Sequence, residues 1–500
     1  MVNTPPPRDG EEHPIGAELP STERELIVLA MPEADLRATG EGIESSGEVD
    51  IAPLADLLAS ENANLRPLFG VNEERLKART TSLLATTDAD VADLSVYYRV
   101  DAPEESLHGL AEQLRELDVV EAAYVKPPGE PPLWLNNMVP LAEEPPIHTP
   151  DFCERQGYLN AAPIGIDARY AWTIAGGRGA EVRIVDLEWS WRFSHEDLTQ
   201  NQGGVVGGVA DEDDDHGTAV IGELGGDRNT FGIEGICSDA NVSAVAFSMP
   251  SAAAIRLAAD RLRPGDIILL EIHRPGPSYD YEKRYDQQGY IAIEWWPDDF
   301  DAIRYAIARG IVVVEAAGNG AENLDAPIYS TRPANFPADW TNPFDRANRD
   351  SGAIVVGAGN PPAGTHGRNA DPATGEVYVD RARCGFSNYG NLIDAQGWGF
   401  EVTSTGYGDL QGGANRDEWY IDEFSGTSSA SPIIVGALGC VQGILRAHGR
   451  YPLTSARARQ LLRTTGSPQQ GASGRPTTQH IGNRPDLRQL IDIVMSDSVP

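Results

Sequence analysis

The sequence is poor in basic residues and in cysteine. It has 39 Lys and Arg against 75 Asp and Glu, which gives a net charge of −36 and a pI near 4.5. A surface of that sign repels phosphates, so we expect no nucleic-acid partner, and a solvated acidic surface that aids solubility is the plainest interpretation. The four cysteines, Cys153, Cys237, Cys384 and Cys440, show neither close pairing nor metal-ligand spacing, which excludes a disulfide framework. Cys440 is expected to be a buried thiol.

The sequence also lacks long apolar runs and a recognisable leader. No apolar run reaches the length of a membrane helix, so we expect no membrane partner. The opening "MVNTPPPRDGEEHPIGAELP" has no basic region followed by an apolar core, so it is not a secretory signal peptide. We therefore expect a protein that is cytoplasmic as made, with leaderless secretion to the extracellular space as the alternative.

Two folded parts are expected on either side of a proline-rich linker. Residues 1–20 are rich in Pro and Glu and are predicted to be disordered. Residues 21–128 contain strand patterns that alternate with helices in a β-α-β-α-β order, which fits a small α+β ferredoxin-like domain (strands 25–31, 94–100 and 119–125). Residues 129–149 form the linker, and residues 150–500 the larger domain.

The larger domain has the pattern of an α/β fold. Short apolar runs alternate with helical stretches such as 297–310, which predicts a doubly wound, mostly parallel sheet with helices on both faces (runs 180–187, 241–247, 266–272, 310–318 and 352–359). In such folds chemistry collects at the carboxyl ends of the strands.

Four polar residues lie where apolar elements begin or end: Asp186, His216, Asn319 and Ser428. A serine becomes a nucleophile when a histidine takes its proton, and the histidine needs a carboxylate that fixes its tautomer. An asparagine amide can stabilise the oxyanion that forms. Each residue alone has a plain structural interpretation as a cap or turn residue, but the four together, each at an element boundary, favour a hydrolytic site.

The motifs around these residues resemble those of the subtilisin-like serine peptidases, or subtilases. "DHGTAVIG" (215–222) resembles the family's histidine motif, and "SGTSSASP" (425–432) its serine motif. "AAGNG" (316–320) resembles the oxyanion segment, "RIVDLEWSWRFSHEDL" (183–198) the aspartate segment, and "IGNRPDLRQLI" (481–491) the closing segment. Sedolisin-type peptidases share the serine motif but lack the "HGT" histidine, so His216 favours the subtilases.

The resemblance implies a serine endopeptidase that acts on protein or peptide substrates and is made as a zymogen. Asp186, His216 and Ser428 would form the catalytic triad, with Asn319 in the oxyanion hole. The N-terminal domain would be an intramolecular inhibitor that also assists folding. The residues expected to bind substrate are Leu270, Glu271, Ile272, Ala317 and Gly318.

Two positions depart from the family pattern. Asp186 is followed by Leu187 and Glu188, and the added charge of Glu188 is expected to raise the pKa of His216. Glu271 stands where a small residue is common, so it either points away from substrate or favours basic and polar substrate residues.

No cofactor is required for this chemistry, although acid-rich loops such as 211–215 leave room for structural Ca²⁺ without assignable ligands. A protein that retains the fold but is catalytically silent, and binds peptides or a partner protein, is the alternative function.

Overall fold

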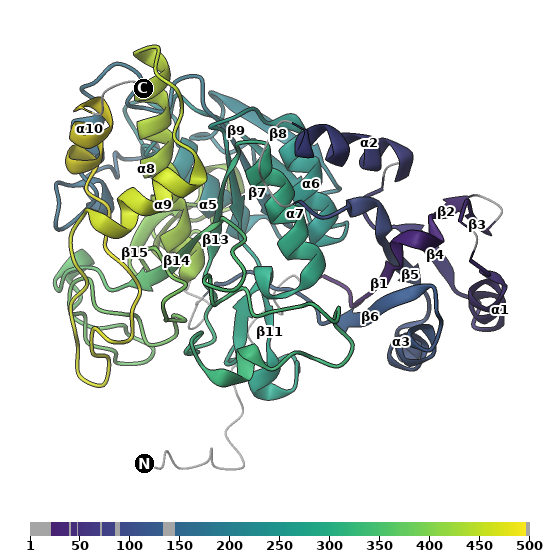
Figure 1. Cartoon of the computed structure of the whole chain (residues 1–500). Coiled ribbons are helices and arrows are strands. Elements are labelled where there is room, and N and C mark those ends of the chain that lie inside the picture. Colours follow the sequence, from purple (N-terminus) through teal and green to yellow (C-terminus); the bar gives the residue numbers. More distant parts are fainter. Residues whose placement is uncertain are drawn as a thin grey trace.

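The computed structural model describes residues 22–39, 42–47, 49–70, 73–85, 91–133 and 146–496. The segment predicted to be disordered (1–20) and most of the predicted linker (134–145) lie outside these ranges. The chain forms a smaller N-terminal unit (residues 22–126) that lies against a larger unit (residues 146–496) (Figure 1).

The large unit is built on a seven-stranded sheet in the order β15-β14-β13-β10-β7-β9-β8, in which all neighbours are parallel. The expected α/β fold is therefore confirmed. The strands are β7 (Arg183–Glu188), β8 (Gln202–Gly207), β9 (Asn241–Ala246), β10 (Ile267–Leu270), β13 (Val312–Ala316), β14 (Ile354–Gly359) and β15 (Ala395–Trp398).

Helices cover both faces of this sheet because the strands are apolar on both faces. Alternate strand residues pack on α5 (Asp215–Gly225) and α8 (Thr427–Ala447) on one face, and on α6 (Ser251–Arg261) and α7 (Pro297–Ala308) on the other. The remaining elements are α4 (Ala168–Ala171), α9 (Ser455–Thr464), α10 (Leu487–Ser496) and two hairpins, β11 (His273–Pro275) with β12 (Tyr290–Ala292) and β16 (Val402–Thr405) with β17 (Tyr420–Phe424).

Helix α8 does have the length and apolar character of a membrane helix, contrary to the expectation from the sequence, but all of its most apolar window is buried inside the protein. In the described part of the chain it alone meets that test. Cys440 lies on this helix and is buried, as expected, and the described cysteines are free thiols.

The N-terminal unit is a four-stranded antiparallel sheet in the order β4-β5-β1-β6, which is the ferredoxin-like strand order. Its strands are β1 (Glu25–Ala30), β4 (Asn64–Pro67), β5 (Tyr97–Asp101) and β6 (Val120–Lys126). Around them lie α1 (Ala52–Ser60), α2 (Glu73–Leu84), α3 (Leu107–Arg115) and a hairpin of β2 (Leu36–Thr39) and β3 (Gly42–Ser45). Strand β4, helix α2 and the hairpin were not predicted.

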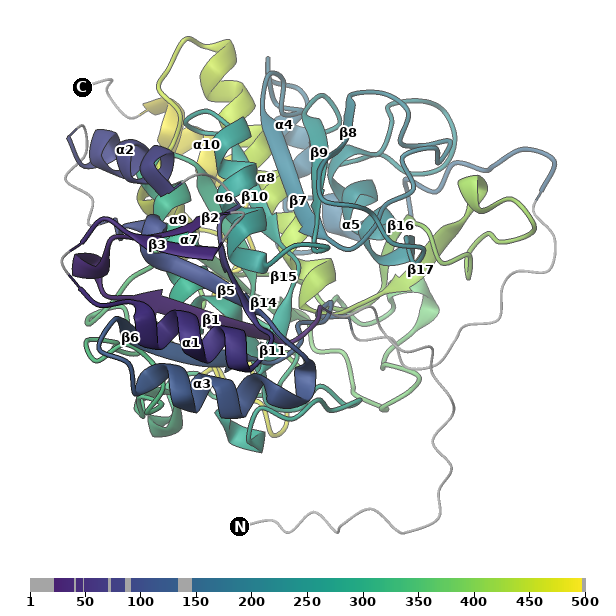
Figure 2. The same cartoon turned by 90° about the vertical axis from the view of Figure 1, so that its right-hand side faces the viewer.

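Both faces of this small sheet are buried. Leu26 and Val28 of β1 pack with α1 and α3, whereas Ile27 and Leu29 belong to the core that includes α6 and α7. Figure 2 shows the small sheet between its own helices and the large unit. Strand β1 is apolar on both faces because one face packs on α1 and α3 and the other packs on the large unit when the N-terminal unit is docked.

Buried charges also join the two units. The Lys126 ammonium lies 2.6 Å from a carboxylate oxygen of Asp298 and 3.0 Å from one of Asp299, in the first turn of α7, and all three side chains are fully buried. Arg274 of β11 donates a hydrogen bond to Glu25 of β1 over 2.9 Å. Since a buried charge is tolerated only when it is paired, these contacts specify how the units dock.

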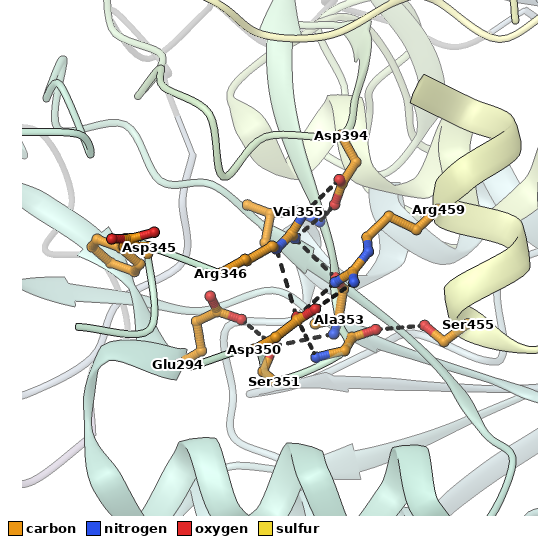
Figure 3. A network of polar contacts seen from close by, with 12 residues as sticks. Glu294, Asp345, Arg346, Asp350, Ser351, Ala353, Val355, Asp394, Ser455 and Arg459 are labelled. Carbon is orange, nitrogen blue, oxygen red and sulfur yellow. Dashed lines mark hydrogen bonds and ion pairs between the residues drawn. The ribbon is translucent and has the colours of Figure 1, made fainter. Parts of the chain in front are cut away.

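A second polar network secures the far edge of the large sheet (Figure 3). Arg346 forms two hydrogen bonds with the buried carboxylate of Asp394, of 2.6 and 2.8 Å, and Asp394 also accepts the amide of Val355 in β14 over 3.0 Å. Arg459 of α9 binds the carboxylate of Asp350. These pairs tie the connection between β13 and β14, and the helix α9, to the strand edge.

Candidate active site

The site lies where elements from distant parts of the sequence meet, at the carboxyl end of the sheet. Glu188 is the last residue of β7, His216 lies in the first turn of α5, and Ser428 lies in the first turn of α8. Asn319 follows the end of β13. This is the edge at which chemistry was expected for a parallel α/β sheet.

His216 is held by a glutamate. Its Nδ1 atom lies 2.6 Å from Oε2 of Glu188, and both side chains are almost completely buried. The backbone permits this approach because residue 217 is glycine: a Cβ there would lie 2.3 Å from the carbonyl oxygen of Ser190. Since Nδ1 faces the carboxylate, Nε2 is the ring nitrogen left to accept a proton.

The prediction that Asp186 orients His216 is wrong. Oδ2 of Asp186 accepts a hydrogen bond from the Trp191 indole over 2.7 Å, and Oδ1 has no hydrogen-bond partner among the described residues. Asp186 and Glu188 point to the same face of β7 because they are two residues apart. Asp186 is in register with Ala244, inside the sheet, whereas Glu188 stands at the strand end that α5 approaches.

Burial sets the pKa values of the pair. Burial lowers the pKa of His216, to about 3, and the charge of Asp213 opposes this shift. Burial raises the pKa of Glu188 well above its usual range, and Asp213 raises it further. The expectation that the charge of Glu188 raises the pKa of His216 is therefore wrong in its net direction, because desolvation outweighs the opposing charge, which is that of Asp213. A neutral imidazole can act as a base.

Other buried carboxyl groups surround the pair. Asp186, Glu223 and Glu271 are fully buried, and burial raises the pKa of each well above its usual range. The charge of Glu188 raises the pKa of Asp186 and of Glu271 further. Like charges so close cannot all be ionised, so we expect the protons in this cluster to be shared.

The acidic run 211–215 is only partly solvated. Asp214 forms ion pairs with Arg192 and Arg416, of 2.7 and 2.5 Å, and Asp215 lies 3.0 Å from Arg416. Within the described ranges, no group of three or more His, Cys, Asp or Glu residues is arranged to hold a metal ion.

Ser428 is fully buried at the start of α8, next to Asn319. Oδ1 of Asn319 accepts hydrogen bonds from the amide and the hydroxyl of Thr427, over 3.0 and 2.9 Å. That arrangement fixes the direction of the Asn319 amide group, whose Nδ2 donates to Oε1 of Gln287 over 3.1 Å.

Residues 129–133, which we call the inserted segment, run directly into this site. Glu130 and His273 exchange two backbone hydrogen bonds of 3.0 Å each, so the segment adds a short antiparallel strand to β11. The carbonyl oxygen of Pro132 accepts from the Ser428 hydroxyl over 2.8 Å and from its amide over 3.3 Å. Nε2 of His216 has no hydrogen-bond partner in the described part of the chain.

The predicted substrate-binding residues are only partly at this segment. The Ile272 side chain lies against Gly129, where a Cβ would be 2.5 Å from its Cδ1. Leu270 is a core residue of β10, and Glu271 contacts the Ser431 hydroxyl in the interior, so neither faces the segment. Ala317 and Gly318 form none of the described hydrogen bonds to residues 129–133, whose described partners in the large unit include His273, Gln287 and Ser428.

Sequence reasoning missed three residues of the site. Glu188 was placed near the triad but not in it, although the alternation of β7 puts it on the same face as Asp186. His273 belongs to none of the motifs, and it lies on β11 with its Nδ1 accepting the amide of Asn319 over 3.2 Å. Gln287 has no chemical motif that could have identified it.

Comparisons with known proteins find similarity to serine proteases. The family model described as "Subtilase family" matches residues 275–482, a stretch that contains Asn319 and Ser428 but begins after Glu188 and His216. The "Intracellular serine protease" of Paenibacillus polymyxa is 24% identical over 318 residues, which cover 60% of this chain and 79% of that protein. "Thermitase" of Thermoactinomyces vulgaris is 27% identical over 318 residues, covering 60% and 85%.

Among solved structures, fervidolysin from Fervidobacterium pennivorans, whose title describes it as a keratinolytic enzyme related to subtilisin, has a TM-score of 0.50 and 15% identity. The superposition covers 98% of this chain but 63% of fervidolysin, which is less than two thirds of that protein, and it shows the fold alone. The family match and the similar proteins lead to one conclusion: residues 275–482 match the subtilase family, and the chain is similar to serine proteases over 60% of its length.

Proposed function

We propose that the protein is a serine endopeptidase that uses a Glu188-His216-Ser428 triad. The contact that carries the proposal is the one between Ser428 and Pro132, in which a backbone carbonyl lies against both the hydroxyl and the amide of the serine. A peptide that pairs with β11 in the same way would present its carbonyl carbon to Ser428.

In this reaction the Ser428 oxygen attacks the carbonyl carbon while its proton passes to Nε2 of His216. Glu188 keeps the proton on Nδ1 and stabilises the imidazolium that forms. The amide of Ser428 and the Nδ2 of Asn319 donate to the developing oxyanion. When the C–N bond breaks, His216 gives its proton to the leaving amine, and water then releases the acyl group by the same steps.

We further propose that the N-terminal unit keeps the enzyme inactive. The inserted segment fills the site, and the Ser428 hydroxyl donates to Pro132 rather than to His216. Buried charges around Lys126 support a tight dock between the units. If the chain cuts itself, the bond between Pro132 and Leu133 is the one aligned with Ser428, so the new N-terminus would be Leu133.

A fluorophosphonate probe and Ser428→Ala test the proposal together. A protease recognition sequence introduced within residues 134–145 allows the full chain to be cut on demand. We expect the wild-type chain to be labelled and to hydrolyse casein after the cut, and the Ser428→Ala chain to do neither. Absence of labelling both before and after the cut would establish the alternative, a catalytically silent module that binds peptides.

We also propose that the enzyme is made and held inactive in the cytoplasm. The support is its similarity to a relative named an intracellular serine protease. Cell fractionation with N-terminal sequencing of each fraction tests this, and active protein only in the medium would contradict it.

A further inference from the structure

One side chain of the inserted segment is held in a way that backbone pairing does not require. Glu130 is 3% exposed, although it is a charged residue within a proline-rich stretch. Its Oε1 atom lies 3.1 Å from the ammonium of Lys283, and the side chains of Gln287 and Tyr290 lie beside the carboxylate. Oε1 accepts no hydrogen bond among the described residues. Burial raises the pKa of Glu130, while these three partners act in the opposite direction by favouring the ionised form.

The three partners come from one connection, between β11 and β12. Tyr290 begins β12, and its hydroxyl accepts the backbone amide of Arg284 over 3.2 Å, so its own proton is left for the carboxylate. Gln287 donates to the carbonyl of Pro131 over 3.1 Å and accepts from Nδ2 of Asn319 over 3.1 Å. The same residues thus contact a side chain, the next carbonyl along the segment, and the amide expected to stabilise the oxyanion.

The connection is anchored in the large unit. The amide of Gly276 donates to the carbonyl of Gly289 over 2.8 Å, and the amide of Gly289 donates to that of Gly320 over 3.0 Å. Tyr290 packs on the ring of His273, with centroids 4.6 Å apart. Because these contacts lie within the large unit, we expect the arrangement to persist when the inserted segment leaves.

We propose that Lys283, Gln287 and Tyr290 form a subsite for an acidic substrate side chain, at the third residue before the cleaved bond. The inference rests on the proposed peptidase function, in which the bond after Pro132 occupies the cleavage position. Glu130 is then the resident occupant of that subsite. Lysine is rare in this protein of net charge −36, since Lys283 is one of three, with Lys77 and Lys126. The placement of a lysine ammonium beside the inserted segment is therefore unusual for this chain.

The subsite gives selectivity through pairing. A Glu or Asp side chain replaces part of its lost hydration with the Lys283 ammonium, beside the polar groups of Gln287 and Tyr290. An alanine offers these groups no carboxylate, and a lysine places like charges together. We expect kcat/KM to be about 10- to 100-fold higher for Glu than for Ala at this position, and lowest for Lys.

The first experiment measures cleavage. The full chain, cut within 134–145, is assayed on internally quenched peptides that differ only at the third residue before the cleaved bond, which is Glu, Gln, Ala or Lys. Lys283→Glu should invert the order between the Glu and Lys peptides, whereas Lys77→Glu, which makes the same charge change on α2, should preserve it. Equal kcat/KM for the Glu and Lys peptides in the wild type would overturn the subsite.

The second experiment does not depend on catalysis. In the uncut Ser428→Ala chain, hydrogen exchange of the His273 amide reports its bond to the Glu130 carbonyl. Glu130→Lys should speed this exchange at least tenfold, and the double variant Glu130→Lys with Lys283→Glu should restore most of the protection.

Unchanged exchange in Glu130→Lys, or no recovery in the double variant, would refute the inference. If no peptide is cleaved but the charge swap restores protection, the subsite stands and the peptidase proposal fails. If peptides are cleaved without preference, only the subsite fails.

Discussion

Nδ1 of His216 lies 2.6 Å from Oε2 of Glu188, while the carboxyl group of Asp186 is bound to the Trp191 indole on the same face of β7. The glutamate, being at the strand end, reaches the first turn of α5. Because one of these two carboxyl groups contacts the histidine and the other does not, they make a matched pair for mutation.

Glu188→Gln should lower kcat by about 10³- to 10⁴-fold, since an amide can stabilise the wrong tautomer of His216 and cannot stabilise its cation. Asp186→Asn should change kcat by less than about tenfold, because an amide oxygen can still accept the Trp191 hydrogen bond. Steady-state kinetics on one peptide substrate compare them. A larger loss of kcat in Asp186→Asn than in Glu188→Gln would mean that Asp186 orients His216.

The pH dependence of kcat/KM should report Asp213. Catalysis needs His216 neutral and Glu188 ionised, and the charge of Asp213 raises the pKa of both groups. Asp213→Asn therefore lowers both pKa values and should move the acidic limb to lower pH. The shift should be about half a pH unit or less and should shrink in high salt, because Asp213 is exposed. Glu212→Gln is the neighbouring control, and an unmoved limb in Asp213→Asn would show that the run does not couple to the site.

Asn319→Ala should lower kcat by about 10²- to 10³-fold with little change in KM, since its amide acts on the oxyanion in the transition state. Gln287→Ala should raise KM as well, because Gln287 also binds the carbonyl of Pro131 and thus contacts bound peptide in the ground state. Full kinetics on both variants separate these roles. An effect of Gln287→Ala on kcat alone would mean that Gln287 only positions Asn319.

Lys126→Met should undock the N-terminal unit. Removing the ammonium leaves the carboxylates of Asp298 and Asp299 buried without their cation, a loss of about 3–5 kcal/mol. Lys77→Met, at a pair with Asp35 that is largely exposed, should cost no more than about 1 kcal/mol. Thermal unfolding and hydrogen exchange of β6 in the full chain measure both. Equal effects of the two variants would mean that the buried pairs do not hold the dock.

Much of the fold could be predicted because its strands carry continuous apolar runs. Strands β9, β10, β13 and β14 lie within predicted ranges, and β7 extends one residue past its predicted range, to Glu188. Strand β8 (QGGVVG) was missed because its glycines break that pattern, and β11 and β12 because they are three residues each, with proline in β11.

At the site, local motifs identified His216, Asn319 and Ser428 because each lies in a characteristic turn. The sequence could not identify the carboxylate partner of His216 in the same way, because Asp186 and Glu188 lie two residues apart on the same face of β7. Contacts between segments far apart in sequence, such as Glu130 with Lys283 and Gln287 with Asn319, leave no local pattern.

The docking of the N-terminal unit has a consequence for how activity would be controlled. The described cysteines are free, so no disulfide joins the two units, and the chain through residues 127–145 is their covalent tie. While that tie is intact, the N-terminal unit proposed as the inhibitor would be present at a high effective concentration, set by the length of the connection. Once it is cut, inhibition becomes bimolecular and weakens on dilution. The same nicked protein would then be silent where it is concentrated and active where it is dilute.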